Sequence, residues 1–426
     1  MSYAATYPER VSTGADARRQ NALSLIFFLC AAAAFLLRFT ISPQILDRVM
    51  NYTAEGGAFY EKLHIGTDAI LLLTPFVLFS RPFFLQADEI IKFRWLLRFT
   101  LLQLLLIAYL ALVGRVNSSG LLIDTYIVAA AAGMLMFALN EGFRRSLGDL
   151  TLIMLIVSAA IGIVEAVTKH RLLPYDLVEL TFRPIGLADH PLGLGALCAT
   201  AIGFVPLTRW RIWLKVAAIL LLFVGCAASG ARFALLTSVA EGFILLLYVP
   251  WRGLSRRHER EAKSIVLIFS LIGGAAMAAI MFAGGLLSRF GNTLFDENFM
   301  ARVSIYEIFG LVNWNDIMFG MRGDVLLALV VSKLHLPAIE SAPVVITLML
   351  GLPLAIVFTI LVFWTIYRLV KGAPLAAWIG TISFLLASLS NNTMSSKTPV
   401  VAILVVLLVA YGIPKSRHAN DDSATA

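Results

Sequence analysis

The chain has 426 residues, of which 59% are hydrophobic and only 14% are charged. A soluble globular domain carries about 25% charged residues, so this chain has more apolar surface than one soluble core can bury. Its mean hydropathy of +0.86 excludes a soluble enzyme held by a single anchor. We interpret the net charge of +8 as topogenic charge on short loops, since no Lys/Arg run with interleaved aromatic residues indicates nucleic-acid binding.

Apolar segments long enough to cross a bilayer recur along the whole chain. They fall at about 22–41, 65–80, 96–114, 121–139, 148–168, 190–207, 211–228, 233–249, 264–287, 342–366, 374–390 and 398–413. The first follows a polar tail with three arginines and resembles a secretory signal, but the same pattern of charge then apolar run repeats later, so we interpret it as a span. The sequence predicts an all-α polytopic membrane protein with about 12 transmembrane helices. They form a single domain over 22–413, between cytoplasmic tails at 1–21 and 414–426.

The distribution of basic residues predicts that both termini are cytoplasmic. In that orientation 21 lysines and arginines face the cytoplasm and 12 face the opposite side, as the positive-inside rule requires. The external loops then lie at about 42–64, 169–189 and 288–341. The last is long, and within it Val325 to Leu334 could form a short amphipathic helix on the membrane surface.

The three cysteines, Cys30, Cys198 and Cys226, all lie in apolar runs without CxxC or His-paired spacing. This pattern is typical of small buried hydrophobic residues. We therefore expect no disulfide, no metal site and no cofactor.

Among the arginines that face outward in this topology, against the positive-inside trend, four stand out beside apolar spans: Arg183, Arg232, Arg302 and Arg322. An arginine beside an apolar span is costly unless a partner or a water-filled cavity offsets the cost. Guanidinium forks match phosphate oxygens and stay charged, so several of them in one outer pocket would bind a diphosphate. The alternative is that each arginine extends to lipid headgroups or pairs with a nearby carboxylate.

Two further segments could carry chemistry. His190 follows Asp189 where a span begins, and it either donates to a phosphate or sugar or belongs to a helix start that Asp189 caps. Glu340 would lie where water meets the bilayer and could accept a proton from a sugar hydroxyl, or it could only stabilise a helix N-terminus. Glu165 and Glu241, within spans, are interpreted as isolated buried carboxylates bonded to a neighbouring helix.

In this order, these residues resemble the bacterial O-antigen ligase and O-antigen polymerase superfamily, which includes exopolysaccharide polymerases. The resemblance covers roughly residues 140–370. It rests on Arg183-Pro184-Ile185-Gly186 with His190-Pro191 opening a span, the Ser229-x-x-Arg232 hinge, Arg302 followed by Gly320, and the polar pair Glu340-Ser341 before Gly351.

The resemblance implies metal-independent glycosyl transfer from an undecaprenyl-diphosphate-linked oligosaccharide at the outer face of the bacterial inner (cytoplasmic) membrane, with the arginines holding the diphosphate. His190 and Tyr306 are assigned to the substrate pocket. Expected partners are the lipid-linked oligosaccharide, membrane lipid, and a flippase and chain-length regulator of the same pathway. No nucleic acid is expected.

Ligases of this superfamily typically carry His-Asn where this chain has Glu340-Ser341. The departure favours a polymerase, in which the acceptor hydroxyl is activated by Glu340 or by no protein base at all. His335 is near enough in sequence to substitute, so a ligase-type transferase remains an alternative. A third hypothesis is that the protein is a lipid-linked oligosaccharide flippase or another transporter. The segment Ser80 to Arg94, however, lacks the Gly- and Asp-rich pattern of major facilitators.

Overall fold

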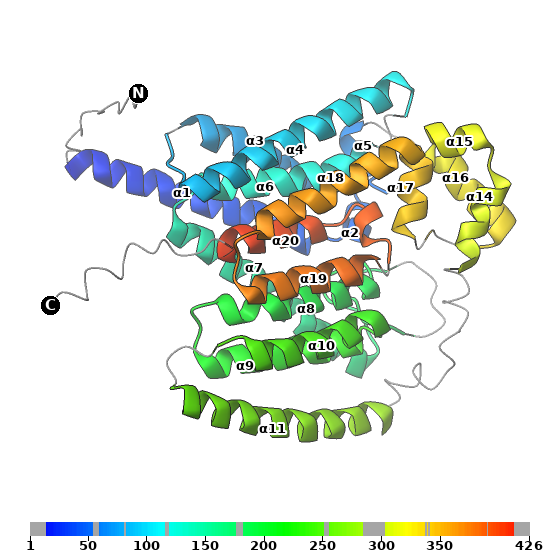
Figure 1. Cartoon of the computed structure of the whole chain (residues 1–426). Helices are drawn as coiled ribbons and strands as arrows, with labels where there is room; N and C mark the ends of the chain where they lie inside the picture. Colours follow the sequence, from blue (N-terminus) through cyan, green and yellow to red (C-terminus); the bar gives the residue numbers. More distant parts are fainter. Residues whose placement is uncertain are drawn as a thin grey trace.

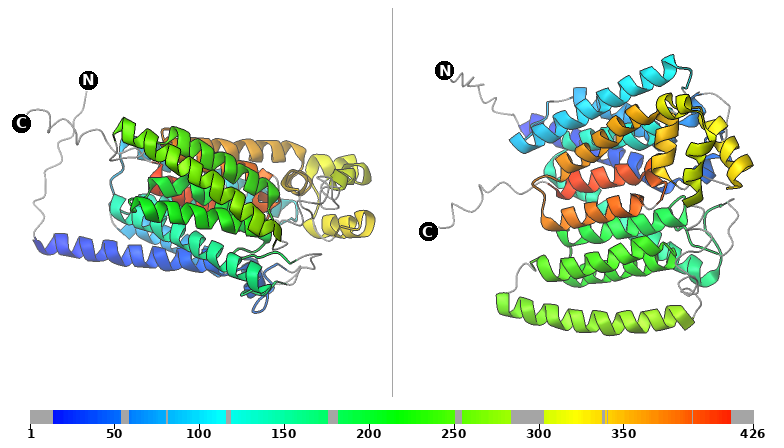
Figure 2. Two further views of the ribbon diagram at one scale, coloured as in Figure 1. Left: turned by 90° about the horizontal axis from the view of Figure 1, so that it is seen from below. Right: turned by 45° about the vertical axis from the view of Figure 1, so that its right-hand side comes forward.

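The computed structural model describes residues 14–53, 59–80, 82–115, 119–175, 182–250, 255–283, 303–336, 339, 341–389 and 391–412. All regular structure within these ranges is helical. The long helices run side by side as a bundle, and the short helices between α14 and α17 gather at one end of it (Figure 1). Figure 2 shows the same arrangement from two further sides.

The first half of the chain forms long helices with several short helical elements between them. Its elements are α1 (Gly14–Thr40), α2 (Pro43–Leu46), η1 (Phe59–Lys62), α3 (Ile65–Ser80), α4 (Ala87–Leu112), α5 (Ser119–Leu121), the π-helix η3 (Leu122–Ile127), α6 (Val128–Phe137), α7 (Glu141–Thr168), α8 (Pro191–Phe204) and η4 (Val205–Leu207).

The second half adds three long helices, a group of short ones and three final apolar helices. Its elements are α9 (Ile212–Ala228), α10 (Arg232–Tyr248), α11 (Arg256–Ala283), η5 (Ile305–Glu307), α14 (Ile308–Leu311), α15 (Trp314–Phe319), α16 (Gly323–Leu329), the π-helix η6 (Val330–Leu334), α17 (Ala342–Leu350), α18 (Leu352–Val370), α19 (Leu375–Leu389), η7 (Thr393–Ser395) and α20 (Val400–Tyr411).

Five of the described helical segments are long and apolar enough to cross a membrane: Gln20–Thr40, Ala87–Leu112, Ser119–Phe137, Glu141–Thr168 and Leu352–Val370. Shorter apolar helices lie among them. Large apolar side chains such as Phe79 (89% exposed) and Leu112 (88%) cover the outside of the bundle, where water would make them costly and lipid would not. The fold is compatible with a helical membrane protein.

Each predicted apolar segment overlaps a described helix, but the segment predicted at 342–366 is not one helix. It is broken at Gly351, which ends α17 and precedes α18 with a φ of 87°. A Cβ on Gly351 would lie 2.5 Å from the carbonyl oxygen of Met318. The backbone therefore turns here against the short helices, at a position that only glycine fills without strain.

The centre of the bundle consists of α6, α8 and α20. Every residue of α6 and α20 is buried, as expected for helices that are apolar on all sides. α8 packs against α19, where a Cβ on Gly203 would lie 2.3 Å from the Cα of Gly380. The two backbones approach closely because neither position carries a side chain.

The cysteine prediction is correct for Cys198 and Cys226, which are buried, and wrong for Cys30, which is exposed. Cys30 lies on an outward face of α1 beside the exposed Leu29, whereas the next residue, Ala31, is fully buried. An apolar run alone does not distinguish a core-facing side from a lipid-facing side.

A second, smaller core lies in the segment between α11 and α18. Its buried residues are Ile305, Ile308, Met321, Leu326, Val330, Val344 and Leu348. The described part of the segment predicted as the long outer loop is thus largely helical. α16 and η6 cover the stretch predicted as an amphipathic helix at Val325 to Leu334.

Candidate functional site

One end of the bundle, which we call the loop-rich end, collects the long connections and the short helices α14–α17 (Figure 1). Its connections include 41–53 with 59–64, 182–190, 229–231 and 391–399. They contact one another: Nε2 of Gln44 donates to the carbonyl of Asp189 at 2.8 Å, and Nε of Arg183 donates to the carbonyl of Ser229 at 3.2 Å. Segments far apart in the sequence therefore form one surface.

The turn that carries Arg183 is fixed by Glu165, near the end of α7. One carboxylate oxygen of Glu165 accepts hydrogen bonds from the backbone N–H groups of Ile185 (2.8 Å) and Gly186 (2.9 Å), and the other accepts from Leu172 (2.9 Å). Glu165 thus binds backbone donors of the following loop, whereas a bond to a neighbouring helix was predicted. A carboxylate that accepts several backbone N–H groups holds a turn firmly.

Arg183 and Arg171 form a pair that the sequence interpretation found only in part. The carbonyl of Arg183 accepts hydrogen bonds from Nε (3.2 Å) and Nη2 (2.9 Å) of Arg171. The Arg171 guanidinium also lies over the rings of Tyr175 (4.2 Å) and Phe182 (4.8 Å), which stabilises the cation. The sequence feature that could have identified Arg171 is its place near aromatic residues in the predicted 169–189 loop.

Arg232 begins α10 directly after the turn that Arg183 contacts. Within this turn Ser229 Oγ donates to the carbonyl of Cys226 at 2.6 Å and accepts from the N–H of Ala231 at 3.2 Å. Gly230 has a φ of 68°, which favours glycine. Arg232 is half-buried. The structure thus brings Arg183 to the turn that presents Arg232, two residues that were predicted to share a pocket.

His190 is the N-cap residue of α8, a role that was predicted for Asp189. Its Nδ1 accepts a hydrogen bond from the N–H of Leu192 at 3.2 Å, and Pro191 follows in the first turn. Burial raises the pKa of the Asp189 carboxyl from 3.8 to about 6. The cap belongs to His190 because its imidazole nitrogen reaches the first free N–H groups of the helix.

The remaining predicted residues lie around α14–α17. Arg322 is exposed and pairs with Asp324 (Nη2 to Oδ2, 2.5 Å), whose pKa is lowered by this hydrogen bond. Tyr306 is 50% exposed and its hydroxyl lies 3.3 Å from Ser341 Oγ. His335 is exposed with a φ of 55°.

For Arg322, the structure thus has the local pairing that was the alternative to a diphosphate contact. Arg302 and Glu340 lie outside the described residues.

A buried polar cluster at the loop-rich end was missed altogether. The fully buried Arg38, near the end of α1, donates through Nη2 to the carbonyl of Asp124 at 2.8 Å. The Asp124 carboxylate accepts from the Tyr52 hydroxyl (2.9 Å) and from the N–H of His64 (3.2 Å). Lys397 lies over the Tyr52 ring at 4.6 Å, and burial lowers its pKa to about 8.

This cluster has more polar atoms than the described residues satisfy. Arg38 Nε and Nη1, Ser42 Oγ, Gln44 Oε1 and Thr67 Oγ1 are buried and have no hydrogen-bond partner in the described part of the chain. Asp124 lies on the π-helix η3, a form that is frequent at functional sites. The sequence feature that could have identified this cluster is a charged residue inside each of two predicted spans, Arg38 in one and Asp124 in the other.

Comparisons with known proteins assign no family or function to this chain. A scan against protein-family models found no match, and a search of curated proteins found none. Among the described residues, no three His, Cys, Asp or Glu side chains gather as metal ligands would.

Proposed function

We propose that the protein is a polymerase of undecaprenyl-diphosphate-linked oligosaccharide repeats in surface polysaccharide or exopolysaccharide synthesis. The observation that carries this proposal is the contact of Arg183 with the turn that presents Arg232, beside Arg171, at the loop-rich end of an apolar bundle. Guanidinium groups next to a lipid-facing surface suit a diphosphate whose tail stays in the membrane.

The proposed topology has twelve passes, made by α1, α3, α4, α5–α6, α7, α8, α9, α10, α11, α18, α19 and α20. Both termini are then cytoplasmic, the loop-rich end is periplasmic, and α17 leads into α18 from the periplasmic side. The charge distribution of the sequence supports this orientation. It puts Arg171, Arg183 and Arg232 where a translocated lipid-linked sugar would arrive.

In the proposed reaction, an acceptor hydroxyl attacks the anomeric carbon of the growing chain. A carbon–oxygen bond forms to the acceptor, the bond to the diphosphate oxygen breaks, and the hydroxyl proton passes to Glu340, to His335 or to solvent. Arg183, Arg232 and Arg302 stabilise the negative charge that develops on the departing undecaprenyl diphosphate. A single displacement inverts the configuration at that carbon. The exposure of His335 keeps a ligase-type transferase as the second candidate.

The test uses purified protein in detergent with lipid-linked repeats and EDTA, without ATP or an ion gradient. A polymerase lengthens the glycan on undecaprenyl diphosphate, whereas a ligase-type enzyme transfers it only when a different acceptor is added. Movement of repeats across vesicles without elongation would identify a flippase. Activity that EDTA abolishes and magnesium restores would contradict leaving-group stabilisation by arginines alone.

A further inference from the structure

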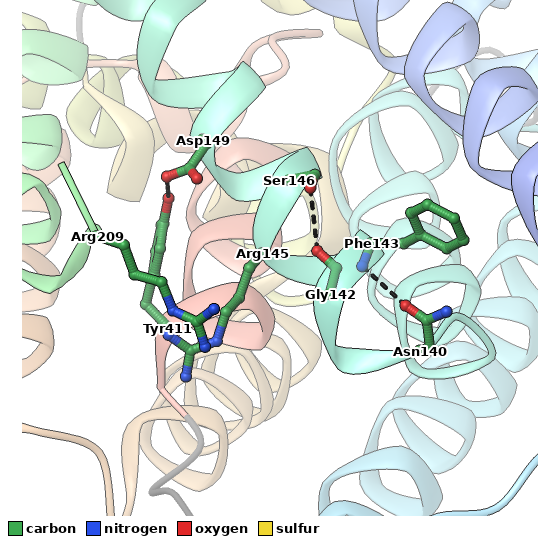
Figure 3. Close-up of a pocket in the computed structure, with 8 residues that line it drawn as sticks. All are labelled: Asn140, Gly142, Phe143, Arg145, Ser146, Asp149, Arg209 and Tyr411. Atoms are coloured by element: carbon green, nitrogen blue, oxygen red, sulfur yellow. Dashed lines mark hydrogen bonds between the residues drawn. The ribbon is translucent and has the colours of Figure 1, made fainter.

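A cavity of about 390 Å³ lies at the end of the bundle opposite the loop-rich end. Its walls come from the start of α7, the turn before α9 and the end of α20, so three parts of the sequence meet there. Figure 3 shows the residues that line it. The cavity is separate from the arginines of the proposed transfer site, and an inference about it does not depend on the proposed function.

Two arginines line this cavity from different elements, Arg145 from α7 and Arg209 from the turn before α9 (Figure 3). Arg145 is partly engaged, because its Nε lies 3.0 Å from a carboxylate oxygen of Glu141. Arg209 is exposed and makes no hydrogen bond or ion pair with the residues that the structure describes. Two positive charges that line one cavity repel each other unless an anion lies between them.

The cavity also holds one carboxylate, Asp149, which is turned toward Tyr411. The Tyr411 hydroxyl donates to Oδ1 of Asp149 at 2.5 Å (Figure 3). Within the described part of the chain, no ion pair joins Asp149 to Arg145 or Arg209. The carboxylate therefore leaves guanidinium N–H groups able to bind a further anion.

Exposed aromatic residues indicate the depth of the cavity relative to a bilayer. Trp213, in the first turn of α9, is 59% exposed, and Tyr248, at the end of α10, is 66% exposed. Both lie at the same end of the bundle as the cavity, and such side chains favour the level of the lipid headgroups. The charge distribution predicts that this end is cytoplasmic, where basic pockets between helices bind anionic headgroups.

We propose that this cavity is a phosphate site in which Arg145 and Arg209 together bind the phosphate group of an anionic ligand. Planar guanidinium groups donate paired hydrogen bonds to phosphate oxygens, and the negative charge relieves the repulsion between the two arginines. The phosphate belongs either to an anionic phospholipid of the inner leaflet or to inorganic phosphate. The experiment separates these two sources.

The lipid arm uses the full chain reconstituted with phosphatidylcholine and phosphatidylglycerol, then extracted for native mass spectrometry. Wild type should retain phosphatidylglycerol, and Arg145→Gln and Arg209→Gln should each retain it about tenfold more weakly, because each loses a charge-assisted contact. Arg211→Gln is the matched control, since Arg211 is an exposed arginine two residues from Arg209 that does not line the cavity. Equal retention of phosphatidylcholine in all four proteins checks that they fold alike.

The phosphate arm uses delipidated protein in detergent, with thermal unfolding followed as inorganic phosphate replaces chloride at constant ionic strength. Selective loss of phosphatidylglycerol in the two variants identifies a lipid site. Stabilisation by phosphate that the variants lose, with unchanged lipid retention, identifies a site for the free anion. If Arg145→Gln and Arg209→Gln behave like Arg211→Gln in both arms, the proposal is overturned.

Discussion

Nε of Arg183 donates to the carbonyl oxygen of Ser229 at 3.2 Å, and this bond joins two turns that lie 46 residues apart. The second turn leads directly into Arg232 at the start of α10. A displacement of either turn would therefore change the relative positions of both arginines. The activity of the proposed site should depend on both residues together.

Replacing Arg183 or Arg232 by lysine keeps the charge but removes the planar fork. We expect each variant to lower turnover roughly a hundred- to a thousandfold, as the loss of one preorganised charge contact does. The measurement is elongation of lipid-linked repeats by purified protein. Arg257→Lys is the control, because Arg257 is an exposed arginine paired with Glu261 on α11. Wild-type turnover in both site variants would rule out the proposed diphosphate contacts.

The proposed base is tested by Glu340→Gln and His335→Ala. If Glu340 accepts the proton, Glu340→Gln should slow the chemical step while lipid-substrate binding stays near wild type, since the change preserves volume. Single-turnover rates and binding of the lipid-linked donor separate the two effects. A fully active Glu340→Gln protein beside an inactive His335→Ala protein would transfer the role to His335 and favour the ligase-type reading.

The proposed orientation predicts which introduced cysteines an impermeant reagent can reach in whole cells. Asn313 and Ser255 are both exposed side chains, at the loop-rich end and at the opposite end respectively. In a chain with Cys30→Ser, which removes an exposed native thiol, Asn313→Cys should be labelled and Ser255→Cys protected. Labelling both sites after the membrane is permeabilised is the control. The reverse pattern would invert the orientation.

We predict that the protein loses stability as the pH falls, because His64 then becomes protonated. Burial, reinforced by the charge of Arg38, lowers the pKa of His64 from 6.5 to about 3. Its Nδ1 accepts from the N–H of Gly66 at 2.9 Å, and a proton on that nitrogen would break the bond. Stability that depends on neutral His64 is complete above pH 6.5 and is lost as the pH falls toward 3.

Thermal unfolding in detergent between these pH values provides the measurement. His64→Gln should flatten the decline of the unfolding temperature as the pH falls, because glutamine does not titrate. His258→Gln, at an exposed histidine on α11, should leave the decline unchanged. An unchanged pH profile in His64→Gln would show that other groups cause the acid loss.

Two glycine substitutions should have opposite effects, one at the contact between α8 and α19 and one outside it on α10. Gly203→Ala would put a Cβ 2.3 Å from the Cα of Gly380, and such overpacking costs about 1–3 kcal/mol. Gly242→Ala on α10 meets nothing within 4 Å and gains up to about 1 kcal/mol of helix propensity. Thermal unfolding of the two variants compares them directly. A Gly203→Ala protein as stable as wild type would mean that the helices separate without cost.

The helices were predictable because their signal is local. The apolar segment predicted at 65–80 is the helix Ile65–Ser80, since its apolar run is bounded by polar residues on both sides. The break at Gly351 was not predicted, because it depends on a contact with Met318 that periodicity does not contain. Residues close in sequence determine the length of a helix, whereas a break of this kind depends on a contact with a residue that is distant in sequence.

The site was predictable only where unusual residues marked it. Arg183 and Arg232 stood out as outward-facing arginines, and the structure brings their turns together. Arg38 and Asp124 did not, because they lie 86 residues apart and meet only after α1 and η3 have packed. The sequence shows that each of these charged residues lies in a predicted span, but it does not show that they are partners.

The second core between α11 and α18 affects the order in which the chain folds during synthesis. Ile305, Ile308 and Leu326 leave the ribosome before Val344 and Leu348 of α17, which complete this core. Until α17 emerges, the short helices have no cover for their apolar sides. Only Gly351 separates the end of α17 from the start of α18, so closure of this core and insertion of α18 follow almost together. A translational pause after the short helices have emerged and before α17 has emerged would prolong the exposed state and favour chaperone binding or proteolysis there.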